Sequence, residues 1–98
     1  MIPPLQQVRL RSINRWMQDN QPAQFKELTR SGELNSRVTA MDEQMIQAFE
    51  TQEDSKKDQM MRDKTWGTGP GMQEFQTDRL TLWEEIVLEF LPVTIDQA

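Results

Sequence analysis

The helical pattern of this chain is clearest in residues 34–49, which read LNSRVTAMDEQMIQAF. Apolar side chains there are spaced by four, three, four and three residues, which places them on one face of a helix. They are Leu34, Val38, Met41, Met45 and Ala48, with Phe49 beside them. The stretch therefore predicts a long central helix with an apolar stripe about two heptads long.

The next fifteen residues, 50–64, are strongly charged and have two interpretations. Glu53 with Lys57, and Asp58 with Arg62, are acid-before-base pairs four residues apart, which favour a solvated continuation of the helix. The alternative is a flexible linker, and both interpretations stay open at this point.

The segment 66–71, WGTGPG, contains three glycines and a proline and is expected to break any helix. A flexible connector around residues 52–75 would include it. A last helix is then predicted to start near Thr77, a suitable N-cap, and to stop at Pro92. Eight of the twelve residues 80–91 are apolar, so this C-terminal helix needs cover over most of its circumference.

Two shorter helices are predicted before the central one. Pro3 and Pro4 suit the first turn of a helix that carries apolar residues up to Met17. Residues 19–22 then read as a stop and a restart, and a second short helix is expected to end at Gly32. The fold class is therefore all-α, with three to four helices in a small bundle or helical hairpin, a long central helix and an apolar C-terminal helix. All 98 residues fit a single domain.

The composition argues against catalysis. The chain has no Cys, His or Tyr, so the usual zinc ligand sets, Ser-His and Cys-His nucleophiles, and haem ligation are missing. The glycine-rich segment lacks the Lys that a phosphate-binding loop carries after its glycines. The glutamates at 84, 85 and 89 lack the His of a di-iron site and are expected to form a solvated face. We therefore expect a protein that is not an enzyme and that binds no metal or cofactor.

The cytoplasm is the expected location. The N-terminal residues include several arginines and lack the apolar core of a secretory signal. No apolar run approaches the roughly 20 residues needed to span a bilayer. The absence of cysteine fits a reducing compartment.

The net charge of −5 is unevenly distributed. Residues 1–40 carry a net charge of +3 and residues 41–98 one of −8. Arg9, Arg11 and Arg15 form a small basic patch with possible phosphate contacts. This patch supports one alternative function, a small nucleic-acid-associated regulator. A second alternative is an acidic inhibitor of a nucleic-acid-binding protein.

The leading hypothesis is a non-catalytic protein–protein interaction module: an adaptor, an assembly factor or a regulator of a larger complex. The C-terminal helix has more apolar surface than a thin domain covers, which predicts self-association as a homodimer. Trp66, beside the glycine-rich segment, is a candidate interface anchor. The expected partner-binding residues are Trp66, Trp83, Ile86, Val87 and Phe90.

Overall fold

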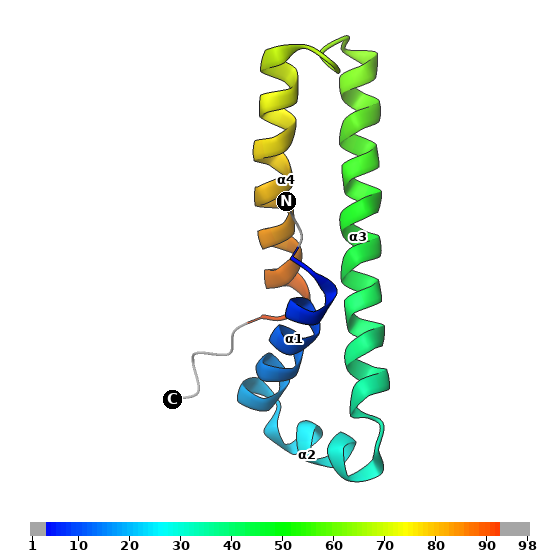
Figure 1. Cartoon of the computed structure of the whole chain (residues 1–98), viewed down its shortest axis with the longest axis vertical. Helices are drawn as coiled ribbons and strands as arrows, with labels where there is room; N and C mark the ends of the chain where they lie inside the picture. Colours follow the sequence, from blue (N-terminus) through cyan, green and yellow to red (C-terminus); the bar gives the residue numbers. More distant parts are fainter. Residues whose placement is uncertain (1–3, 93–98) are drawn as a thin grey trace.

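A computed structural model describes residues 4–92 of the chain, and these residues form four α-helices and no strand. The helices are α1 (Gln6–Asn20), α2 (Pro22–Ser31), α3 (Leu34–Arg62) and α4 (Gly69–Phe90). The predicted all-α class with a long central helix is confirmed. Helices α3 and α4 form a long antiparallel hairpin, and α1 and α2 lie at one end of it (Figure 1).

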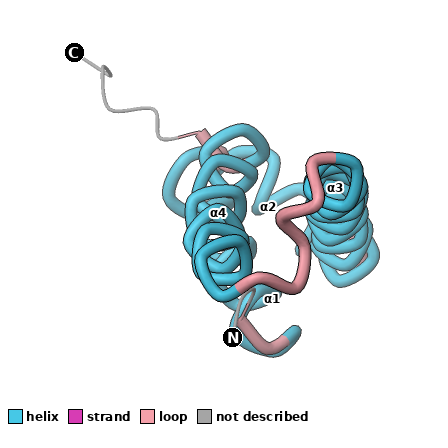
Figure 2. Tube along the Cα trace, turned by 90° about the horizontal axis from the view of Figure 1, so that it is seen from above, coloured by secondary structure: helices cyan, strands magenta, loops and turns pink. Residues whose placement is uncertain are grey.

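The molecule is elongated, with principal extents of 53 × 31 × 18 Å. Its radius of gyration is 16.7 Å, compared with about 13 Å for a compact domain of this length. The 29 residues of α3 account for the elongation, because at 1.5 Å per residue they extend about 44 Å. Helices α1, α2 and α4 all lie to one side of α3, and both views show this (Figures 1 and 2).

The helix boundaries near the N-terminus follow the sequence pattern. Helix α1 ends at Asn20 and Pro22 starts α2, as the stop and restart predicted. Gly32 ends α2 in the left-handed conformation, with φ of 79°, which glycine adopts without steric cost. Pro4 lies before the N-cap of α1 and not in its first turn. Pro3 lies outside the described residues.

The charged residues after Phe49 continue α3 to Arg62 instead of forming a linker. They pair mostly across the hairpin and not along the helix. Glu53 forms an ion pair with Arg79 of α4, so the predicted pairing of Glu53 with Lys57 is wrong. The helices leave only residues 63–68 of the segment 52–75 in a loop, and its proposed flexibility stays a prediction.

Lys56 makes the second link across the hairpin. Its Nζ lies 2.9 Å from Asp78 and 3.4 Å from Glu74. The hydrogen bond to Asp78 raises the pKa of Lys56 above its usual value, although desolvation acts in the opposite direction. Because the pKa of Lys56 is raised in the folded state, its ion pairs stabilise the fold at neutral pH. This contribution is lost as the pH rises through the folded-state pKa.

The predicted start of the last helix at Thr77 is wrong. Helix α4 begins at Gly69, with Thr68 as N-cap, and Pro70 lies in its first turn. Proline and glycine are tolerated there because the first N–H groups of a helix have no intrahelical partner. The predicted apolar C-terminal helix is not confirmed, since residues 80–90 are the second half of a longer helix whose first half is largely polar.

The main core lies where α1 packs against the α3–α4 hairpin. Its buried side chains come from three helices and from the residue that ends α4, and Phe49 contacts the Trp83 ring edge-to-face at 5.9 Å between centroids. The indole N–H of Trp16 donates to the carbonyl of Pro92 (2.9 Å) and fixes the end of α4 against α1. The buried core residues are Ile13, Met17, Val38, Met45, Phe49, Ile86 and Leu91.

The N-cap of α4 gives a first stability prediction. The Thr68 hydroxyl accepts a hydrogen bond from the Gly71 N–H (3.0 Å), so Thr68→Ala should cost about 1 kcal/mol. Thr77 is the matched control, because its hydroxyl donates to the Gln73 carbonyl (3.1 Å) inside the helix and caps nothing. Urea unfolding of both variants measures the difference. Equal stabilities for the two variants would contradict the cap assignment.

Candidate functional site

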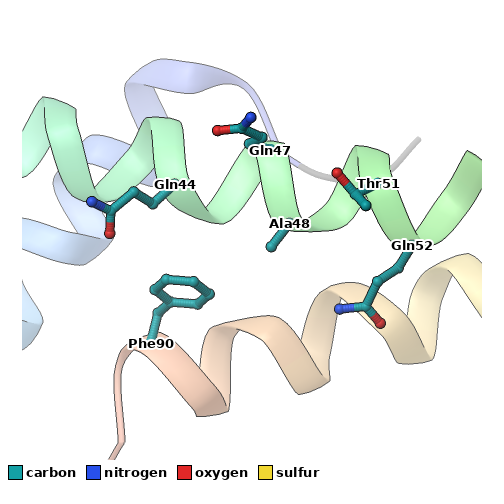
Figure 3. Close-up of a pocket in the computed structure, with 6 residues that line it drawn as sticks. All are labelled: Gln44, Gln47, Ala48, Thr51, Gln52 and Phe90. Carbon is teal, nitrogen blue, oxygen red and sulfur yellow. The ribbon is translucent and has the colours of Figure 1, made fainter.

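A groove runs between the middle of α3 and the end of α4, with a volume of about 420 Å³ (Figure 3). Ala48 lies opposite the Phe90 ring, and this small side chain leaves the space that the groove occupies. The Phe90 ring is half-buried against the core cluster and points toward α3. The groove is lined by Gln44, Gln47, Ala48, Thr51, Gln52 and Phe90.

The groove is chemically suited to binding and not to proton transfer. None of its lining residues titrates near neutral pH. The three glutamine amides each provide donors and an acceptor, and Phe90 adds an apolar surface. Such a lining can hold a side chain or a helix of another protein through uncharged contacts.

The groove is part of a longer uncharged face of α3. Each residue of this face lies three or four positions from another, so all of them share one side of the helix, over about four turns. All of them are exposed except Ala48, which is half-buried. Arg37 precedes and Asp58 follows these residues on the same side, and Asp54, seven residues after Gln47, lies at the edge. We define the uncharged face of α3 as Ala40, Gln44, Gln47, Ala48, Thr51 and Ser55.

Phe90 was predicted as a partner contact, but the α3 residues opposite it were not. Ala48 was assigned to the apolar stripe, and the glutamine and threonine residues are neither apolar nor charged. The missed signal was an uncharged helix face with a period of three to four residues in a stretch otherwise rich in charge. Such a pattern is visible in the printed sequence once α3 is known to continue past Phe49.

The other residues expected on α4 as partner contacts lie in or against the core. Ile86 is only 2% exposed and packs inside the core cluster. Trp83 and Val87 are half-buried against the same cluster. The structure therefore separates Phe90, which faces the groove, from the other three.

Trp66 lies in the loop between α3 and α4, far from the groove. Its ring contacts Phe75 edge-to-face at 5.0 Å between centroids, and the Lys57 ammonium group lies 5.1 Å from the ring centroid. Trp66 is half-buried in this arrangement and covers the distal end of the hairpin. The structure does not bring Trp66 together with Phe90.

The three arginines proposed as phosphate contacts are also separated. The Arg9 guanidinium binds the buried carboxylate of Asp42 at 2.6 and 3.0 Å. Arg11 and Arg15 are exposed on α1, and Arg15 lies 3.8 Å from Asp19. Of the three arginines, only Arg11 and Arg15 are thus exposed on α1, and the Asp19 carboxylate lies beside them.

Residues 4–92 contain no candidate metal site and no membrane-spanning helix. No three Asp or Glu side chains in this range come close enough to share a metal ion, and Glu84, Glu85 and Glu89 are all exposed. None of the four helices is long and apolar enough to cross a bilayer. No protein-family model matches the chain, and none of the curated proteins or solved structures compared with it does either.

Proposed function

We propose that this chain is a non-catalytic protein–protein interaction module that works within a larger complex. The proposed binding surface is the uncharged face of α3 together with Phe90. One observation carries the proposal: α3 exposes a strip of uncharged residues over about four turns, with Asp54 at its edge, in a chain in which 28% of residues are charged.

The composition of this surface supports protein binding over the alternatives. The centres of protein interfaces are depleted in charged residues and enriched in aromatic ones, and this surface has both properties. Binding to nucleic acid depends on cations that contact phosphates, and the uncharged face has none. The absence of cysteine fits work in a reducing compartment such as the cytoplasm.

A pull-down from the native host tests the proposal with one substitution. Ala48→Arg places a long charged side chain in the groove, where a partner would have to bury it. We expect the unmodified chain to retain a stoichiometric partner protein at high salt, and the variant to lose it at least tenfold. Circular dichroism should show the same helicity and the same Tm for both chains, because the arginine head can reach solvent.

Ala23→Arg is the matched control, since Ala23 is exposed on α2, away from the groove. It should retain the partner like the unmodified chain. Two results would contradict the proposal: no protein retained at high salt by any of the three chains, or equal retention by the Ala48 and Ala23 variants.

A further inference from the structure

The charged residues at the two ends of the uncharged face indicate which molecule binds there. We propose that this face binds the same face of a second copy of the chain, with the two α3 helices antiparallel about a two-fold axis between Gln47 and Ala48. This inference rests on the proposed function and adds the partner, the orientation and the register.

The order of charges along α3 fits an antiparallel pair. Glu33 and Arg37 precede the uncharged face, and Asp58 and Arg62 follow it. About an axis midway between residues 47 and 48, Arg37 lies opposite Asp58 of the partner, and Glu33 lies opposite Arg62 of the partner. In a parallel, in-register pair each of these residues would instead lie beside its own copy, and like charges would repel.

The same charges select one register. If one α3 is shifted by one turn along the other in one direction, Arg37 still lies opposite an acid, Asp54 of the partner. Glu33 then lies opposite Asp58 of the partner, and these two like charges repel. A shift of one turn in the other direction sets Arg37 against Arg62. Among these three registers, the one centred between Gln47 and Ala48 is the only one in which both charged residues before the face meet opposite charges.

The charged residues lie on the same side of the helix as the uncharged face. Arg37, Gln44, Thr51 and Asp58 are seven residues apart, which is close to two full turns. All four are exposed. Within residues 4–92, neither Arg37 nor Asp58 forms an ion pair, so both charges are available to a partner.

The middle of the face is self-complementary, as a two-fold interface requires. In the proposed register Ala40 lies opposite Ser55, and Gln47 lies opposite Ala48, so small side chains let the helices approach closely. Gln44 lies opposite Thr51, and both side chains can donate and accept hydrogen bonds. The charged residues at the two ends of the face, Glu33, Arg37, Asp58 and Arg62, sum to zero, whereas the whole chain carries −5.

Charge reversal tests the pairing of Arg37 with Asp58. Sedimentation equilibrium at high micromolar concentration should show a reversible dimer. Arg37→Glu and Asp58→Arg should each weaken it by about tenfold, because symmetry turns two attractive contacts into repulsive ones. The double variant should restore the dimer, since the opposite charges then meet in exchanged positions. Arg11→Glu, an equal charge change on α1, should leave the dimer unchanged.

Cysteine cross-linking tests the axis, and the chain has no native cysteine to interfere. Gln47→Cys lies at the axis and should form a disulfide-linked dimer. In the antiparallel register two copies of residue 55 are about 22 Å apart along the helix, so Ser55→Cys alone should not cross-link. A mixture of Ala40→Cys and Ser55→Cys chains should cross-link, because these positions lie opposite each other.

The outcomes separate this inference from the proposed function. If the double variant fails to restore the dimer, the proposed register is wrong but self-association stands. The same holds if the Gln47→Cys and Ser55→Cys chains each cross-link with themselves equally well. A monomer at high micromolar concentration overturns the second copy as occupant. In that case the pull-down with the Ala48→Arg variant still decides whether the groove binds another protein.

Discussion

Asp42→Ala is expected to destabilise the fold by about 3–5 kcal/mol, because it removes one partner of a buried ion pair. Asp42 is only 1% exposed, and its two carboxylate oxygens accept hydrogen bonds from Arg9 at 2.6 and 3.0 Å. The third donor of the same guanidinium, Nη1, bonds the Pro4 carbonyl at 2.7 Å. Without the carboxylate, a largely buried cation loses its counter-charge, and α1 loses its polar attachment to α3.

Urea unfolding of the variant measures this loss. Glu43→Ala is the matched control, since it removes an exposed carboxylate from the next residue of α3 and should change stability by less than about 0.5 kcal/mol. A double variant with Arg9→Met and Asp42→Leu should recover most of the stability, because no unpaired charge is then buried. Equal stabilities of the Asp42 and Glu43 variants would show that the ion pair does not hold α1 in place.

The role of Arg9 shows a limit of sequence reasoning. Arg9 was grouped with Arg11 and Arg15 because the three are close in sequence, but its partner in the fold is 33 residues away. Local spacing contains no information on such a pair. A weaker signal did exist, since Asp42 lies beside Met41 and Met45 on the buried side of the apolar stripe, and a carboxylate in that position needs a cation.

The elements predicted correctly are those specified by local sequence. The apolar stripe of residues 34–49 placed α3, and Pro22 and Gly32 marked the bounds of α2. The continuation of α3 through residues 50–62 was left open because it depends on ion pairs with α4, which are tertiary contacts. Of the groove, only Phe90 was predicted, since the other side of the groove belongs to a helix that is distant in sequence.

The start of α4 was misplaced for a different reason. Glycine and proline in segment 66–71 were taken as interior residues, where they break helices, although they occupy the first turn, where they are tolerated. The correct signal was a threonine N-cap followed closely by proline, at Thr68 and Pro70. Thr77 has the same side chain without the following proline, and it lies within the helix.

Gly71→Ala is expected to destabilise the fold by about 2–4 kcal/mol, because its methyl group has no space. A Cβ built on Gly71 would lie 2.0 Å from the Thr65 carbonyl oxygen and 2.6 Å from the Thr68 hydroxyl oxygen. The Thr65 carbonyl belongs to the loop backbone and cannot rotate away like a flexible side chain. The loop between α3 and α4 would have to move, and the N-cap hydrogen bond from Gly71 to Thr68 would be lost with it.

Gly69→Ala is the matched control, because it adds the same methyl group two residues earlier in the same helix. No atom lies within 4 Å of a Cβ built on Gly69, so this variant should be neutral or more stable by up to about 1 kcal/mol. Urea unfolding gives both stabilities. Helix propensity favours alanine equally in both variants. If Gly71→Ala destabilises the fold while Gly69→Ala does not, the difference is therefore due to the close approach of Thr65 to α4. Stabilisation of both variants would show that the loop has another conformation, and the contact of Trp66 with Phe75 would then need reassignment as well.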